Sequence, residues 1–102
     1  MDNIERISAM EKRLNDYHYA LSRLEDALDQ FEKKQDDLSE LTEYYGSETW
    51  YEDRESNDEG KLPDTLARGV LTEDLIYNAI MDNHTVSIQL LEVATKIIKD
   101  RF

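Results

Sequence analysis

The sequence has no cysteine in its 102 residues. This absence excludes disulfide scaffolds, thiolate metal sites and cysteine nucleophiles. Basic residues are also scarce, because 12 lysines and arginines stand against 24 aspartates and glutamates, a formal net charge of −12 at pH 7. A nucleic-acid binder needs a basic surface to neutralise phosphates, and so does a protein held on anionic lipid. We therefore expect neither direct nucleic-acid binding nor membrane association.

Long apolar runs and helix-breaking residues are equally rare. No apolar run approaches the roughly 18 residues needed to cross a bilayer, and the first six residues lack the apolar stretch of a signal peptide. We therefore expect a cytoplasmic protein. Only three glycines and one proline occur, all between residues 46 and 69. The remainder can form uninterrupted helix, which predicts an all-α protein, and the length fits a single domain over residues 1–102.

The first long helix is predicted over residues 3–45. Its apolar and aromatic side chains recur three and four residues apart, which is the a/d spacing of a helix packed along a seam. These residues are Ile7, Met10, Leu14, Tyr17, Leu21, Leu24, Leu28, Phe31, Leu38 and Tyr45. Asp2, with Glu5 three residues later, can cap the start of this helix, and Asn3 is the alternative cap. Gly46 can end the helix in a left-handed conformation.

A second helix is predicted over residues 72–101, with Thr72 as its N-cap and Glu73 and Asp74 in its first turn. Leu71, just before the cap, is expected to pack on Ile76. The helix carries two apolar stripes, one beginning at Ile76 and one at Ile88. Two such stripes are more than one helical neighbour covers, so the two helices are expected to form a long hairpin that needs further helices around it.

The connector, residues 46–71, is expected to fold back over the helices, with a short helix that begins at Ser47. Aromatic residues cluster around its start. Large aromatic side chains with a polar atom are common anchors in protein interfaces. The candidate interaction surface therefore consists of Tyr44, Tyr45, Trp50, Tyr51 and Arg68. The alternative is that the aromatic residues close the end of the bundle and that Arg68 forms a surface ion pair with acids of the connector.

The sequence contains no motif typical of catalysis or of metal binding. Neither His18 nor His84 has a carboxylate three or four residues away, the spacing used for metal sites in helical bundles. Carboxylate pairs such as Glu25 with Asp29 resemble those that hold magnesium, but in so acidic a chain such pairs arise by chance, and a solvated acidic face is the preferred explanation. No nucleophile motif or phosphate-binding loop occurs. We therefore predict no enzyme activity and no catalytic, metal-binding or cofactor-binding residue.

Three short blocks of sequence resemble a bacterial family known as domain of unknown function 4298. They are YYGSETW at residues 44–50, GKLP at 60–63 and RGVLTED at 68–74. The long helix before them and the helix after them match the layout of that family, so the resemblance covers nearly the whole chain. The resemblance implies a small, mostly helical protein without an assigned activity, and it brings no catalytic residues.

Helix lengths lead to an expectation about association. At 1.5 Å per residue, the second helix is about 45 Å long and the first about 65 Å. An antiparallel hairpin would therefore leave roughly the first 15 residues of the long helix unaccompanied. A symmetric homodimer forming a four-helix bundle would cover them and the second stripe. The alternative is a monomer whose connector folds over these surfaces.

Three functions remain open on the sequence alone. The first is a non-enzymatic protein–protein interaction module with an unknown protein partner. The second is an acidic mimic of nucleic acid that binds a basic protein. The third is a magnesium-dependent all-α hydrolase that uses the carboxylates of the first helix.

Overall fold

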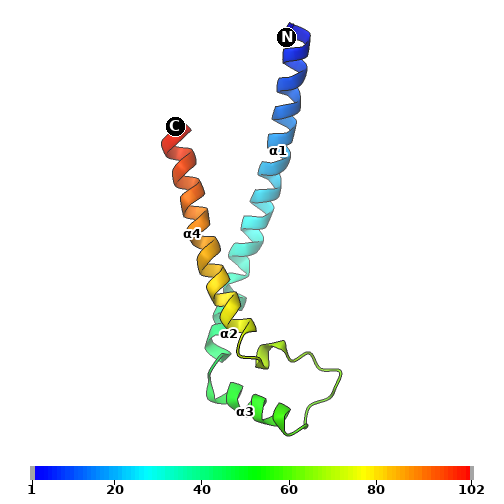
Figure 1. Cartoon of the computed structure of the whole chain (residues 1–102), viewed down its shortest axis with the longest axis vertical. Helices are drawn as coiled ribbons and strands as arrows, with labels where there is room; N and C mark the ends of the chain where they lie inside the picture. Colours follow the sequence, from blue (N-terminus) through cyan, green and yellow to red (C-terminus); the bar gives the residue numbers. More distant parts are fainter. Residues whose placement is uncertain (1, 102) are drawn as a thin grey trace. The chain divides into compact units, whose positions relative to one another are not determined.

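The structure, a computed structural model, describes residues 2–101 of the chain and the side chains of residues 2–100 (Figure 1). Over that range it is all-α and contains no strand, which confirms the all-α part of the prediction. The elements are α1 (Asn3–Lys33), α2 (Gln35–Tyr44), α3 (Glu48–Asp58), the 3₁₀ turn η1 (Gly69–Leu71) and α4 (Leu75–Arg101). The chain divides into two compact units, residues 1–36 and 37–102, and the boundary falls within α2.

The first unit is essentially α1. Asp2 caps it as predicted, because its side chain accepts a hydrogen bond of 2.7 Å from the backbone N–H of Glu5. Exposed ion pairs between residues four apart support the helix, Lys12 with Asp16 at 2.8 Å and Lys33 with Asp29 at 2.9 Å. None of its residues is buried. The apolar side chains of α1 therefore contribute little to a core within this unit.

The prediction of one continuous helix over residues 3–45 needs a correction at Lys34. The structure ends α1 at Lys33 and begins α2 at Gln35. The side chain of Gln35 donates a hydrogen bond of 3.2 Å to the carbonyl of Phe31, the acceptor that its own backbone N–H would use in an uninterrupted helix. Gln35 also brings a polar group to the apolar seam. The helix therefore divides next to Gln35, the first position where the spacing of three and four residues falls on a polar side chain.

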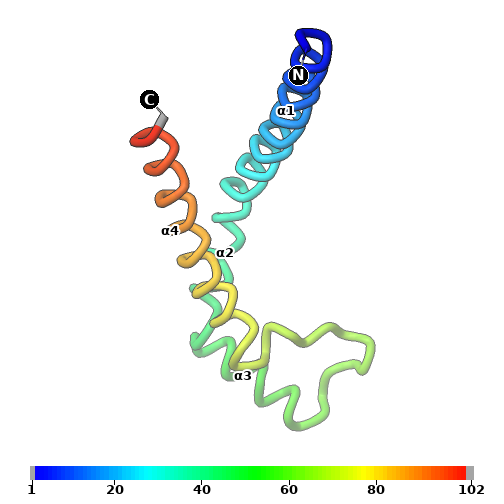
Figure 2. Tube along the Cα trace, turned by 45° about the horizontal axis from the view of Figure 1, so that its top comes forward, coloured from blue at the N-terminus to red at the C-terminus, as the bar shows by residue number. Residues whose placement is uncertain are grey.

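The connector begins as the sequence predicts. Gly46 follows α2 with a φ of 78°, which is the left-handed conformation that glycine adopts without steric strain. Ser47 is the N-cap of α3, and its side-chain oxygen accepts from the backbone N–H of Trp50 at 3.2 Å. Gly60, with a φ of 71°, turns the chain after α3. Figure 2 shows the loop that then returns the chain through η1 to the start of α4.

The second long helix begins three residues later than predicted. Thr72 has an extended backbone, and its hydroxyl donates to the carbonyl of Gly69 at 2.8 Å while accepting from the N–H of Leu75 at 3.3 Å. Thr72 therefore helps to cap the N-terminal end of α4. Glu73 and Asp74, however, form a turn ahead of α4 and not its first helical turn. The backbone N–H of Asn78 donates to the carbonyl of Asp74 at 2.8 Å, so the helical bonding of α4 starts at Asp74 and its first residue is Leu75.

Among residues 2–100, the buried apolar residues all lie in the second unit. They are Trp50 of α3, Leu71 of η1 and Ile76 of α4, with exposed fractions of 3%, 8% and 3%. The η1 turn packs against both α3 and α4. The expected contact region around Leu71 and Ile76 is thus part of the core. This small core holds the connector to the start of α4.

Candidate functional site

Trp50 is the centre of the connector. The cap formed by Ser47 places it in the first turn of α3, and its ring is almost completely buried. Its indole Nε1–H donates a hydrogen bond of 2.9 Å to the carbonyl of Val70 in η1. This bond satisfies the one polar group of the buried side chain and joins two segments 20 residues apart. Trp50 therefore holds the connector together from within.

Two tyrosines pack on Trp50 edge-to-face. The ring centroids of Tyr45 and Trp50 lie 5.0 Å apart at 65°, and those of Trp50 and Tyr51 lie 5.0 Å apart at 73°. The hydroxyl of Tyr45 donates to the backbone carbonyl of Glu73 at 2.9 Å. The end of α2, the start of α3 and the turn before α4 thus meet at one aromatic group. This arrangement agrees with the alternative that the aromatic residues have a packing role.

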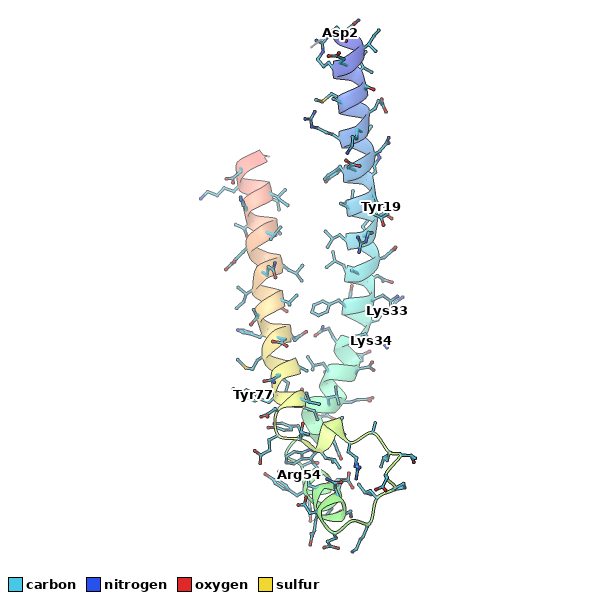
Figure 3. All side chains as sticks on the ribbon, turned by 45° about the vertical axis from the view of Figure 1, so that its right-hand side comes forward. Asp2, Tyr19, Lys33, Lys34, Arg54 and Tyr77 are labelled. Atoms are coloured by element: carbon cyan, nitrogen blue, oxygen red, sulfur yellow. The ribbon has the colours of Figure 1, made fainter. Side chains whose placement is uncertain are left out.

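Arg54 is a member of this group that the sequence analysis missed. It lies four residues after Trp50 on α3, and its guanidinium carbon is 4.7 Å from the centroid of the Trp50 ring (labelled in Figure 3). Its Nη1 is also 3.4 Å from Oε1 of Glu73. The spacing of four residues on a helix is the signal that could have identified the pair. Arg54 covers the aromatic group with a charged atom that stays near solvent.

Tyr44 and Arg68 belong to a second, more polar part of the connector. The hydroxyl of Tyr44 donates to Oδ2 of Asp53 at 2.6 Å, and Nη1 of Arg68 donates to Oδ1 of Asn57 at 3.0 Å. The expected partner of Arg68 was an acid, and the structure gives a neutral amide instead, because Asn57 is the residue of α3 that faces it. Tyr44, Asp53 and Arg68 line one pocket of about 340 Å³ together with Leu62, Leu66, Ala67, Val70 and Leu71.

The Tyr44–Asp53 bond predicts a loss of stability at alkaline pH. Desolvation first, and then the hydrogen bond to Asp53 and the charge of that carboxylate, raise the pKa of Tyr44 from 10.0 to about 12. Because the pKa in the folded state lies above that of the unfolded chain, the contribution of Tyr44 is complete below pH 10 and is lost as the pH rises toward 12. The Tyr44→Phe variant lacks this group.

We therefore expect the difference in unfolding free energy between the native chain and Tyr44→Phe to shrink between pH 10 and 12. Absorbance of tyrosinate, measured as the difference between the two proteins, gives the pKa directly. Asp53→Asn should lower that pKa, since it removes the negative acceptor. A difference titration centred at 10 in the native chain would contradict the contact.

The five candidate residues are therefore brought together in the second unit, but with unequal exposure. Trp50 is buried, Tyr44, Tyr45 and Arg68 are half-buried, and Tyr51 is 59% exposed. Tyr51 is thus the member of the set with the largest surface for a partner. Its ring also contacts Trp50, whereas the other four each form a hydrogen bond to another residue of the second unit.

A larger exposed apolar surface lies on α1. We call it the α1 seam, and it consists of Ile7, Met10, Leu14, Tyr17, Leu21, Leu24, Leu28 and Phe31. The first seven of these side chains are between 38% exposed, at Leu21, and 62% exposed, at Tyr17. Figure 3 draws the side chains along α1 and labels Tyr19 and Lys33, which lie off the seam. An extended apolar stripe of this kind usually marks an interface.

Across residues 2–101, no cluster of three or more histidine, aspartate or glutamate side chains is placed to hold a metal ion. None of the helices in the described part of the chain is long and apolar enough to cross a membrane.

Comparisons with known proteins give one result. The family model described as domain of unknown function DUF4298 matches residues 7–93, which include the α1 seam, the whole connector and most of α4. No curated protein and no solved structure matches the chain. Since the match covers most of the sequence and agrees with the blocks at residues 44–50, 60–63 and 68–74, the chain belongs to the DUF4298 family.

Proposed function

We propose that the protein is a cytoplasmic, non-enzymatic protein–protein interaction module and that the α1 seam is its binding surface. The observation that carries this proposal is the exposure of seven regularly spaced apolar side chains on a helix with no buried residue. Burial of such side chains on association is favourable by about 25 cal/mol per Å² of apolar surface removed from water. The charged residues on the rest of α1 would keep the free chain in solution.

The connector has a supporting role in this proposal. Its aromatic side chains are largely used to hold α2, α3 and the start of α4 together, through the bonds of Trp50 to Val70 and Tyr45 to Glu73. Tyr51 remains accessible beside them. The connector thus joins α2, α3 and the start of α4, and any contact it makes with a partner is centred on Tyr51.

Association is proposed to begin with a second copy of the same chain, as a dimer that builds a four-helix bundle. The α4 helix supports this, because large apolar side chains are exposed along much of its length, among them Met81, Ile88, Leu91, Val93 and Ile98. Two α4 helices and two α1 helices together would offer each apolar stripe more than one neighbour.

Size-exclusion chromatography with light scattering tests the proposal. A mass of twice 12.0 kDa is expected, with dissociation only on dilution. A capture experiment from cell extract runs beside it, comparing the native chain with Leu21→Asp, a change in the middle of the seam. The proposed function would be overturned if the native chain had a monomeric mass and captured no protein that the Leu21→Asp variant fails to capture.

A further inference from the structure

The charges beside the α1 seam have a regular arrangement. With Ile7 as an a position and Met10 as a d position, the seam runs through four heptads to Phe31. The g positions, just before each a position, carry Arg6, Arg13, Ala20, Ala27 and Lys34. The e positions, just after each d position, carry Glu11, His18, Glu25 and Glu32. One edge of the seam is therefore basic and the other acidic.

The pairs within α1 lie on the opposite side of the helix. Lys12 with Asp16 and Asp29 with Lys33 occupy b, c and f positions, and so does Arg23, whose guanidinium carbon is 5.6 Å from the centroid of the Tyr19 ring. These contacts support an exposed helical face. The edge charges are on the face that also presents the apolar seam, where a partner helix would meet them.

This pattern distinguishes between the two directions in which two α1 helices can pair. In a parallel pair, each g residue faces the e residue five positions later in the other chain, so Arg6 meets Glu11 and the reverse contact occurs as well. In an antiparallel pair, g faces g and e faces e. With the seams fully overlapped, that places Arg6 near Lys34 and Glu11 near Glu25, and like charges in contact are unfavourable.

The α4 helix does not carry a matching pattern. The residues on either side of its stripe are mostly apolar; they are Tyr77, Ala79, His84, Val86, Leu91, Val93, Ile98 and Asp100. With Asp100 as the one acidic residue among these positions, α4 offers the two edges of α1 no matching series of charges. A second α1 places Glu11 opposite Arg6 on both sides of a parallel seam.

We infer that the α1 seam pairs with the α1 seam of a second copy of this chain, parallel and in register, and that Arg6 and Glu11 set this direction. The inference rests on the proposed function, whose binding surface it assigns to a defined occupant. The area is sufficient, because four heptads reach the length at which coiled coils form. A two-fold axis parallel to α1 would relate the copies.

Charge reversal in the full-length chain tests the direction. Arg6→Glu places glutamate against Glu11 twice in a parallel dimer, and Glu11→Arg places arginine against Arg6 twice. Each variant alone should raise the dimer dissociation constant about tenfold or more. An equal mixture of the two should form a heterodimer close to the native affinity, because both contacts are then attractive. High salt should reduce all these differences.

Cysteine substitution tests the register, since the native chain contains no cysteine. Position 3 is a d position at the start of α1, so two copies of Asn3→Cys meet across a parallel seam and should form a disulfide under mild oxidation. In an antiparallel dimer they lie about 40 Å apart or more. Ser8→Cys, at an outward b position, is the matched control and should remain reduced over the same time.

Three results would overturn the inference. Tighter association of Arg6→Glu, without an Asn3→Cys disulfide, would show antiparallel pairing, because glutamate would then meet Lys34. A monomeric native chain would exclude the second copy. If that monomer still retains a different protein and loses it on Leu21→Asp substitution, the seam binds another partner and the proposed function stands without this inference.

Discussion

Replacing Trp50 with alanine is expected to lower the free energy of unfolding of the second unit by about 3–5 kcal/mol. The change removes the largest of the three buried apolar side chains, together with the Nε1–H bond to Val70 and the edge contacts with Tyr45 and Tyr51. Small domains unfold at about 5–15 kcal/mol in total, so a loss of this size brings the unit close to its unfolding midpoint. Urea denaturation followed by circular dichroism measures it.

Two further variants separate the causes. Tyr51→Ala removes a 59% exposed ring that touches the same tryptophan, and we expect a cost of about 1 kcal/mol or less. Trp50→Phe retains most of the packing but loses the bond to Val70, and we expect a cost of about 1–2 kcal/mol. Equal midpoints for Trp50→Ala and Tyr51→Ala would show that Trp50 does not hold the connector.

Local signals explain why much of the fold can be predicted from the sequence. Asp2 and Ser47 are capping residues whose hydrogen bonds reach only three residues along the chain, and Gly46 and Gly60 adopt the positive φ that favours glycine at turns. Periodicity identifies the two long helical segments because an a/d pattern persists over many turns. Each of these inferences depends on residues that are neighbours in sequence.

The connections between distant residues could not be predicted in the same way. The contact of Trp50 with Val70 and that of Tyr45 with Glu73 depend on how the loop returns, which no spacing encodes. The division at Lys34 coincides with a bond from the Gln35 side chain to the carbonyl of Phe31, a contact that the spacing of apolar residues does not reveal. The short 3₁₀ turn η1 has no periodic signature, so neither this turn nor the later start of α4 follows from the spacing of apolar residues. The aromatic cluster was therefore identifiable as a set of residues but not as a packed unit.

The change with the greatest expected effect on association is Leu21→Asp. Leu21 occupies an a position at the middle of the α1 seam and is 38% exposed in the single chain. Association removes from water only the 38% of each leucine surface that is still exposed, so most of the cost comes from placing an aspartate carboxylate of each copy in the apolar seam, and we expect a total loss of about 3–6 kcal/mol. This predicts a rise in the dimer dissociation constant of about 10²- to 10⁴-fold. Light scattering over a dilution series measures it.

Tyr19→Asp is the matched control for this change. It introduces the same residue on the same helix, two positions away, and also removes a large exposed side chain, but from the outward face. Its contact with Arg23 is exposed and contributes about 0.5–1 kcal/mol at most to helix stability. If α1 associates through its seam, Tyr19→Asp remains dimeric at concentrations where Leu21→Asp is monomeric. Equal weakening by both variants would mean that aspartate acts by destabilising the helix, and the seam would then lose its place as the binding surface.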